Sequence, residues 1–368
     1  MNHQMNKKVL YIGFKRYNSI LNGGGLENER TLRTLRKRFG DTQVDEYYMI
    51  DERKGRSLWS KLMAVYYTLF DLHNGLTPKK VREITAKAHE GYDYVFISTS
   101  VLGILAKALK ESGYQGNTIV HFHNIEEIYY DAITPKWLPG RQFVVRCAAH
   151  NDRYACDYAD KIITLCKRDS DYLANHYGRT ADAVIGIGLK DRCKQAEDQE
   201  VMTNEVPNCL FLGSYFAPNN EGVLWFVNNV LPHVNIQFKI VGKGMKALKE
   251  QNECLKDVEV LSDVPDLEPF FIEADFMILP IFSGSGMKVK TCESLMYGKN
   301  IIGSDETFEG YELNTDEAGK QCNTAEEYIA AINHFCQHPV KRFNAYSRQI
   351  FLEKYSEEAT EEKILNIL

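Results

Sequence analysis

The sequence predicts an α/β protein made of two doubly wound, Rossmann-like domains. Short apolar runs alternate with amphipathic helical segments in both halves of the chain, a pattern typical of parallel sheets covered by helices. The length of 368 residues suits two domains of ordinary size. A polar stretch, KDRCKQAEDQEVMTNEVP at residues 190–207, separates the two halves and has the composition of a linker. We therefore expect domains at 1–190 and 208–350, a linker at 191–207, and a separate C-terminal helical segment at 351–368.

Composition and targeting signals favour a cytoplasmic protein. Hydrophobic residues make up 44% of the chain and charged residues 26%, as in soluble globular proteins. No apolar run approaches the roughly 18 residues that span a bilayer, and the N-terminal sequence MNHQMNKKVLYIGF lacks the apolar core of a signal peptide. The nine cysteines are scattered without a CxxC pair. We expect them to be reduced, and their spacing matches no standard zinc pattern.

The net charge of −6 is unevenly distributed. Residues 1–200 contain 30 Lys and Arg against 25 Asp and Glu, a net charge of +5, whereas residues 201–368 contain 14 against 25, a net charge of −11. This asymmetry indicates either two surfaces with different partners or a drift in composition. A basic first domain favours contact with an anionic lipid surface or a lipid diphosphate, and nothing indicates a nucleic-acid partner.

The first domain contains six predicted strands. They are expected at residues 8–14, 43–50, 92–99, 117–122, 161–166 and 183–188. Helices are expected between them, including 26–38, 57–72, 101–112 and 142–159. The segment 57–72 is rich in aromatic residues, which fits a core helix, or a helix at a lipid surface or an acceptor groove.

Two polar segments of the first domain lie where ligands are expected. Gly24 and Gly25 belong to a glycine loop that precedes helix 26–38 and is either a close wrap around a ligand or a flexible loop. His123, Asn124 and Glu126 follow strand 117–122, and ligands of open parallel sheets bind beyond the carboxyl ends of strands. The alternative for His123 is a structural role at the end of the strand.

The second domain repeats the alternation. Strands are expected at 208–213, 238–241, 258–264, 277–281 and 300–303. Helices are expected at 267–273, 287–297, 324–338, 340–354 and 356–367, with another after Pro218.

The stretch from Phe276 to Gly310 contains the strongest chemical signal. A strand is followed by the small residues 283–286 and then by a helix with Lys288 and Lys290 in its first turn. Lysine opposes the helix dipole there, so a bound anion explains it well. Glu293, one turn later, is able to accept hydrogen bonds from two sugar hydroxyls. The alternative is an ordinary i,i+3 ion pair between Lys290 and Glu293.

The segment GSGMKVKTCESLMYGKNIIGSD at residues 284–305 resembles the nucleotide-sugar motif of family-4 glycosyltransferases, the glycosyl transferases of group 1. The resemblance implies the GT-B fold, in which two Rossmann-like domains flank a cleft, with the acceptor on the side of the first domain. It also implies that segment 351–368 packs back on that domain. Ser285 stands where the fuller motif has the first of two glutamates, and Ser214 and Tyr215 stand where many members have a phosphate-binding arginine.

The resemblance also implies roles for individual residues. His123 is the candidate catalytic residue, while Asn124 and Glu126 are expected to contact the sugar or the acceptor. Glu293 is expected to hold the ribose of the donor. The other expected donor-binding residues are Gly24, Gly25, Lys243, Ser262, Val264, Gly284, Ser285, Gly286, Met287, Lys288, Val289 and Lys290.

The predicted function is retaining transfer of a sugar, of the hexosyltransferase type, from a nucleotide-sugar to a glycan or lipid-linked acceptor. Polysaccharide or glycoconjugate assembly at the inner face of the cell membrane is the expected setting. We expect neither a metal nor another cofactor, because lysines and a helix N-terminus serve the leaving group. The alternatives are a nucleotide-sugar epimerase of GT-B fold, a phosphorylase, and a catalytically inactive regulatory or scaffold subunit.

Overall fold

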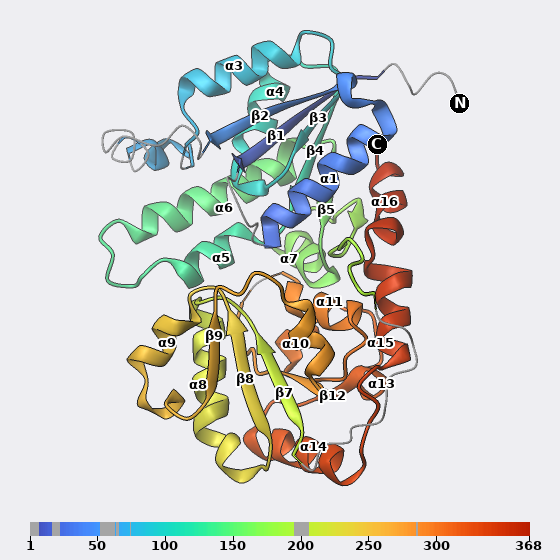
Figure 1. Ribbon diagram of the computed structural model, residues 1–368. Coiled ribbons are helices and arrows are strands. Elements are labelled where there is room, and N and C mark those ends of the chain that lie inside the picture. Colours follow the sequence, from blue (N-terminus) through green and yellow to red (C-terminus); the bar gives the residue numbers. More distant parts are fainter. Residues whose placement is uncertain are drawn as a thin grey trace. The chain divides into compact units, whose positions relative to one another are not determined.

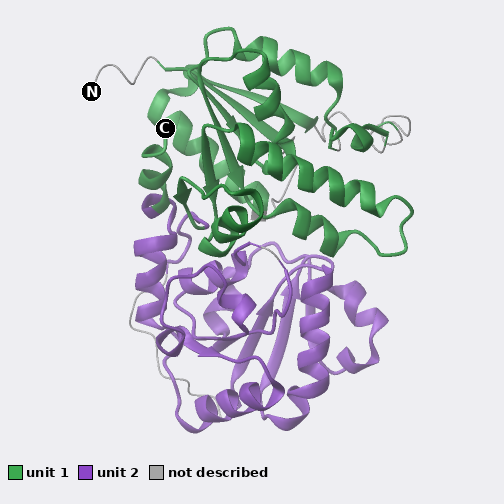
Figure 2. Cartoon of the chain, turned by 180° about the vertical axis from the view of Figure 1, so that it is seen from behind, with its two compact units in different colours: residues 1–186, 360–368 green, residues 187–359 purple. Residues whose placement is uncertain are grey.

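The computed structural model describes residues 7–16, 23–51, 63, 66–73, 75–194, 206–284 and 286–368. Ser285 and residues 57–62 of the aromatic segment lie outside them. The chain forms two compact units, coloured separately in Figure 2. Unit 1 comprises residues 1–186 and 360–368, and unit 2 comprises residues 187–359.

Unit 1 contains a six-stranded sheet with helices on both faces (Figure 1). Its strands are β1 (Val9–Arg16), β2 (Val44–Asp51), β3 (Tyr94–Ile97), β4 (Asn117–Phe122), β5 (Lys161–Thr164) and β6 (Ala183–Val184). Its helices are α1 (Gly23–Phe39), α3 (Pro78–Ala88), α4 (Ile104–Glu111), α5 (Glu126–Ile133), α6 (Arg141–Tyr158) and α7 (Lys167–Tyr177). Short 3-10 helices are η1 (Asp41–Gln43), η3 (Thr68–Phe70) and η4 (Ser100–Leu102).

Alternation along the strands of unit 1 builds a core on each face of the sheet. In β1, Leu10 and Ile12 join one buried cluster, and Val9 and Tyr11 join the other. The first cluster includes apolar residues of α3, α4, α6 and α7. The second includes residues of α1 and also Ile364 of α16 (Glu357–Leu365). Both faces are therefore covered, as an all-parallel sheet requires.

Unit 2 contains a second six-stranded parallel sheet. Its strands are β7 (Asn208–Leu212), β8 (Gln237–Gly242), β9 (Glu259–Ser262), β10 (Phe276–Leu279), β11 (Ile301–Gly303) and β12 (Gly319–Gln321). Its helices are α8 (Ala217–Asn229), α9 (Met245–Gln251), α10 (Glu268–Glu273), α11 (Val289–Met296), α12 (Asp305–Phe308), α13 (Thr315–Ala318), α14 (Ala325–Gln337) and α15 (Ala345–Ile350). The 3-10 helices η5 (Leu231–His233) and η6 (Glu253–Leu255) and the π-helix η7 (Phe351–Tyr355) complete it.

The strand orders identify the point in each sheet where the winding direction of the chain reverses. Unit 1 has the order β2-β1-β3-β4-β5-β6, and unit 2 has the order β12-β11-β10-β7-β8-β9. In unit 2 the chain therefore winds outward from β7 in one direction and from β10 in the other. Ligands of doubly wound folds bind at the carboxyl ends of the strands beside this switch point. The predicted fold class is thus confirmed, with one doubly wound sheet in each unit.

Several predicted boundaries were wrong for identifiable reasons. Gly24 and Gly25 do not form a loop, because α1 already begins at Gly23. The predicted helix 101–112 is interrupted at Gly103, where a Cβ atom would lie 1.9 Å from the carbonyl oxygen of Asn151. The predicted helix 340–354 is the shorter α15 continued by a π-helix.

Two further features concern the cysteines and the helices of the chain. All nine cysteines lie within the described residues, and all are free thiols. Within the part of the chain that the structure describes, no helix combines the length and apolarity needed to cross a membrane.

Candidate functional site

The strand–loop–helix unit of β10 and α11 lies at the switch point of unit 2. The loop between them contains Gly284 and Gly286, whose φ angles of 141° and 62° lie in the region that favours glycine. The N-cap of α11 is Lys288, and its first turn includes Lys290. Unpaired backbone N–H groups at such a helix start attract anions.

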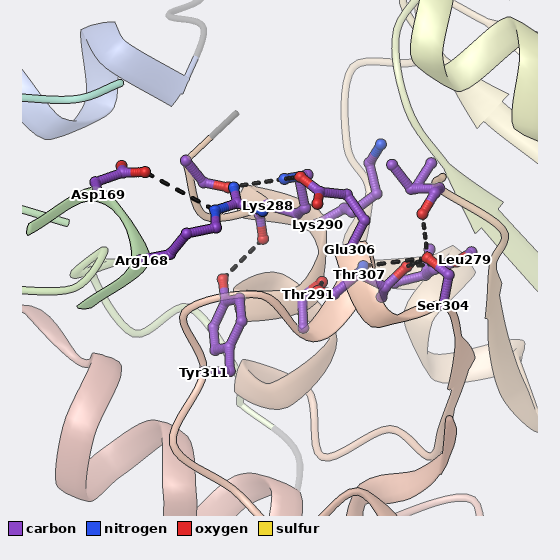
Figure 3. A network of polar contacts seen from close by, with 12 residues as sticks. Arg168, Asp169, Leu279, Lys288, Lys290, Thr291, Ser304, Glu306, Thr307 and Tyr311 are labelled. Atoms are coloured by element: carbon purple, nitrogen blue, oxygen red, sulfur yellow. Dashed lines mark hydrogen bonds and ion pairs between the residues drawn. The ribbon is translucent and has the colours of Figure 1, made fainter. Parts of the chain in front are cut away.

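Lys288 is held by neighbours of the loop. Its Nζ atom donates to Glu306 Oε1 at 2.6 Å and to the carbonyl oxygen of Gly286 at 2.7 Å. The hydroxyl of Tyr311 donates to the carbonyl oxygen of Lys288 at 2.8 Å (Figure 3). Side-chain exposure is only 11% for Lys288 and 16% for Glu306. The loop therefore holds this cation in a fixed position before any ligand binds.

Lys290 joins the two halves of the sheet at the switch point. Its Nζ atom donates to Asn219 Oδ1 in α8, the helix that follows β7, and lies 5.3 Å from the centre of the Phe211 ring. Asn219 in turn donates to the carbonyl oxygen of Ser214 at 2.8 Å. Burial lowers the pKa of Lys290 to about 7, with a further contribution from Lys288. An anion beside it would favour the charged form.

Glu293 is a buried carboxylate that forms an ion pair with Arg192. Its Oε1 atom accepts from Arg192 Nη2 at 3.1 Å, and the carboxylate is about nine-tenths buried. Burial raises the pKa of Glu293, while Arg192 and Lys290 lower it in part. Lys290 and Glu293 thus have different hydrogen-bond partners, so the simple i,i+3 ion pair does not describe them. The Glu293 carboxylate still has acceptor capacity for a ligand.

Close backbone packing fixes the surroundings of these side chains. A Cβ atom on Gly222 of α8 would lie 1.8 Å from the carbonyl oxygen of Pro280, in the loop after β10. A Cβ atom on Gly242 would lie 1.9 Å from the carbonyl oxygen of Gly213. Both glycines are required because the loops after β7, β8 and β10 meet backbone to backbone.

The remaining predicted donor residues of unit 2 follow neighbouring strands. Lys243 is exposed just after β8, and its carbonyl oxygen accepts from the N–H of Tyr215 at 2.8 Å. Ser262 ends β9 and donates to Asp263 Oδ2 at 2.7 Å. Asp263 has a φ angle of 58°, and Val264 after it is half-buried. The carboxyl edge of this sheet thus gathers Lys243, Ser262, Val264 and the β10–α11 loop.

Hydrogen bonds from hydroxyl groups, which the sequence did not indicate, support the residues around the site. Thr291 donates to the carbonyl oxygen of Thr307 at 2.8 Å, and Thr307 donates to that of Leu279 at 2.6 Å. Ser304 donates to the carbonyl oxygen of Ile281. Figure 3 shows these hydroxyls between α11, α12 and the end of β10. These bonds connect α11, α12 and the end of β10.

The polar residues of unit 1 form a different kind of site. His121 at the end of β4 and His123 just after it lie with their rings edge to face, 4.6 Å apart. The Nδ1 atom of His121 lies 4.0 Å from Glu27 Oε1 in α1, and Glu27 accepts from Arg30 of the same helix. Arg30 also donates to the carbonyl oxygen of Gly186 at 3.2 Å. All four side chains are buried.

Burial keeps both histidines neutral. It lowers the pKa of His123 to about 3, with Arg30 as the second cause, and it holds the pKa of His121 well below its usual range. The Nε2 atoms of both rings are buried without a hydrogen-bond partner among the described residues. A neutral His123 is suited to hydrogen bonding with a sugar hydroxyl or to proton transfer.

Glu126 and Asn124 complete the predicted set in unit 1. Glu126 begins α5, and its Oε1 atom accepts from Thr99 Oγ1 at 2.9 Å. Burial raises the pKa of this carboxyl group to about 7. Asn124 is half-buried, and Gly24 and Gly25 lie in the first turn of α1, the helix that also carries Glu27 and Arg30. Helix α1 and the end of β4 thus supply the polar groups of unit 1.

The partners that sequence reasoning missed come from distant segments. Arg192, Asn219, Glu306 and Tyr311 contact the lysines or the carboxylate of α11, and Glu27, which is paired with Arg30, lies beside His121. One signal was available in the sequence: Asn219 directly follows the Pro218 that was expected to open a helix. The other partners had no local pattern.

The comparisons with known proteins agree with this architecture. Residues 206–338 match the family model described as Glycosyl transferases group 1. No curated protein matches the sequence.

Solved structures match over nearly the whole chain. HepE of Anabaena in complex with UDP has 14% identity and a TM-score of 0.68, covering 98% of this chain and 99% of its own. Sucrose-phosphate synthase from Thermosynechococcus elongatus has 11% identity and a TM-score of 0.72, with 98% of each chain covered. WaaG, a glycosyltransferase involved in lipopolysaccharide biosynthesis, has 15% identity and a TM-score of 0.66, covering 98% and 99%. At such identities the structures establish the fold. The chain therefore has the GT-B fold of the group 1 glycosyltransferases, whose family model its second unit matches over residues 206–338.

Proposed function

We propose that this protein is a retaining glycosyltransferase of the hexosyltransferase type. In this proposal it transfers a sugar from a nucleotide-sugar to a glycan or lipid-linked acceptor in polysaccharide or glycoconjugate assembly. The observation that carries the proposal is the pair Lys288 and Lys290 at the start of α11, with buried Glu293 one turn later. That arrangement offers two cations and a helix N-terminus to a diphosphate, and a carboxylate to a ribose.

The chemistry that these residues have to perform is stabilisation of a leaving group. When the glycosidic bond breaks, negative charge develops on the nucleoside diphosphate. Lys288 is already positioned by Glu306 and by the Gly286 carbonyl oxygen, so little reorganisation accompanies the reaction. Lys290, whose pKa burial lowers to about 7, takes up a proton when the diphosphate binds beside it.

The donor assignment is supported by the similar structures. HepE is described in complexes with UDP and with UDP-glucose, so we propose a nucleotide-sugar donor and would test uridine nucleotides first. Backbone groups near Ser262 and Val264 at the end of β9 are the proposed contacts of the base. His123 is the proposed partner of the sugar at the reaction centre, with Asn124 and Glu126 on the acceptor.

Metal independence and location are parts of the same proposal. The lysines would supply the charge that a divalent ion otherwise supplies, so turnover should persist in excess chelator. We place the reaction in the cytoplasm, with peripheral contact at the inner face of the membrane, because a lipid-linked acceptor would lie there.

A calorimetric panel of UDP, GDP, ADP, CMP and their sugars tests the proposal. Wild type should bind one nucleotide, and Glu293→Ala should weaken that binding by about 1–3 kcal/mol through loss of a charged hydrogen-bond partner. Glu253→Ala is the matched control, because that glutamate of η6 has a side chain that is 88% exposed. Turnover of the sugar nucleotide to a transferred sugar, rather than to an isomerised donor, separates a transferase from an epimerase. If no nucleotide binds to the wild type, the proposal fails.

A further inference from the structure

The hairpin of α5 and α6 in unit 1 has an exposed surface that is both apolar and basic. Figures 1 and 2 both show the two helices extending away from the sheet, with their connecting loop at the far end. The structure describes every residue from 128 to 146, and of these only Thr134 is buried. The core of α6 begins further on, at Cys147. We call residues 133–146 the hairpin tip.

The exposed surface of this hairpin is strongly apolar. Trp137 is 80% exposed, the largest value among the exposed large hydrophobic residues of the described chain. Five of the fourteen such residues belong to the hairpin: Ile128, Ile133, Trp137, Leu138 and Phe143. A soluble surface scatters such residues singly, and their concentration marks an interaction site.

The charges of the hairpin tip are all positive. Lys136, Arg141 and Arg146 lie within it, and residues 132–151 contain no Asp or Glu. The Arg146 guanidinium lies 5.5 Å from the centre of the exposed Phe143 ring. Arg141 is paired with Asp131 on α5, whereas Lys136 and Arg146 have no carboxylate within ion-pair distance among the residues that the structure describes.

The loop presents these side chains on a defined backbone. Arg141 braces it by donating to the carbonyl oxygens of Asp131 at 2.8 Å and of Thr134 at 3.2 Å. The N–H of Leu138 donates to the carbonyl oxygen of Pro135 at 3.0 Å, and Gly140 turns the chain with a φ angle of 85°. An ordered tip loses little conformational freedom on docking.

The base of the hairpin is firmly attached to unit 1. Asn151 of α6 donates to the carbonyl oxygen of Asp71 at 2.9 Å, and Asp152 accepts from Ser100 at 2.6 Å and from the N–H of Glu127 at 3.0 Å. The hairpin is therefore fixed to the rest of unit 1, which also contains His123.

We propose that the hairpin tip docks on the surface of an anionic lipid bilayer. Trp137 and Leu138 insert at the level of the headgroups, where the amphipathic indole ring is favoured, and Lys136 and Arg146 contact lipid phosphates. The proposal rests on the lipid-linked acceptor of the proposed function, and it places the membrane contact outside the aromatic segment 57–72, which the sequence had suggested. A bilayer fits both the positive charge and the protruding apolar side chains of the tip. A protein partner would instead be expected to dock into a pocket or a groove.

Co-sedimentation of the full chain with vesicles tests this surface. Vesicles of phosphatidylcholine with and without phosphatidylglycerol are compared at low and high salt. Wild type should bind the anionic vesicles at low salt. Trp137→Ala with Leu138→Ala should weaken that binding at least tenfold, and Lys136→Gln with Arg146→Gln should weaken it roughly 10–30-fold on the anionic vesicles alone.

Controls separate this proposal from the proposed function. Leu352→Ala removes an exposed apolar side chain from η7 and should leave vesicle binding unchanged. Nucleotide affinity, measured by calorimetry on the same variants, should also be unchanged. If wild type binds no vesicles while binding a nucleotide, the surface is wrong and the proposed function is untouched. If Trp137→Ala changes the mass measured by sedimentation velocity, the tip contacts a second copy and the membrane proposal is overturned.

Discussion

The carboxyl edges of the two sheets handle charge in opposite ways. At the edge in unit 2, Lys288 and Lys290 lie beside a helix N-terminus, each with an oxygen partner, and an anion bound there would favour the charged form of Lys290, whose pKa burial lowers to about 7. At the edge in unit 1, burial holds His121 and His123 neutral and favours the protonated form of Glu126. The first arrangement suits an anion, and the second suits neutral hydroxyl groups. The same doubly wound topology therefore supports two chemistries, and the difference lies in a few side chains.

The largest effect should come from the cationic edge. Replacing Lys288 or Lys290 by Met keeps the apolar stem and removes the charge, so turnover of the nucleotide-sugar should fall about 10²–10³-fold for each. Steady-state kinetics measures this. Lys246→Met is the control, since the Lys246 side chain of α9 is 78% exposed. If turnover falls less than tenfold in both Lys288→Met and Lys290→Met, the leaving group is stabilised by other residues.

The neutral groups at the carboxyl edge of the sheet in unit 1 should make the free energy of unfolding depend on pH. The pKa of Glu126 is about 7 in the folded protein against 4.5 in the unfolded chain, so the folded state binds more protons between these values. The free energy of unfolding contributed by Glu126 therefore falls as pH rises from 4.5 to 7, by roughly 3 kcal/mol.

Glu126→Gln removes this titration and keeps an acceptor for Thr99. Chemical denaturation at several pH values should show a flatter profile for the variant than for wild type. Asp152 contributes in the same direction, because burial and Glu126 raise its pKa well above the usual range. Parallel profiles for the two proteins would contradict a protonated Glu126.

A third prediction concerns the charge of Lys290. Because burial lowers its pKa to about 7, a nucleoside diphosphate has to bind with uptake of a proton above that pH. Affinity should fall up to tenfold per pH unit between pH 7 and the raised pKa of the complex. Calorimetry in buffers of different ionisation enthalpy counts the protons. Lys290→Met should abolish the uptake, and uptake that persists in this variant would assign it to another group.

The smallest expected effect concerns Arg192. Its guanidinium lowers the pKa of Glu293, which burial raises. Arg192→Gln should therefore move the acidic limb of nucleotide binding to higher pH by less than one unit, because the arginine is 56% exposed and its field is screened. Affinity for inorganic pyrophosphate should not change. A shift in pyrophosphate binding would place Arg192 on the phosphates.

The sequence by itself determined the two α/β domains, because buried parallel strands read as apolar runs such as 277–281. It also determined the loop and helix of Lys288, Lys290 and Glu293, since strand, glycines and first-turn lysines are consecutive there. The helix start at Gly23 was missed, because glycine has low helix propensity and tertiary packing overrides it.

Only the tertiary structure decided the partners of these residues. Lys290 meets Asn219 and Glu293 meets Arg192 across separations of 71 and 101 residues. His121 meets Glu27 because β4 and the helix after β1 converge at one edge of a sheet, and His123 packs against His121. Burial then sets the pKa of Lys290, of His123 and of Glu126, and burial depends on every element packed around a group rather than on its neighbours in the chain.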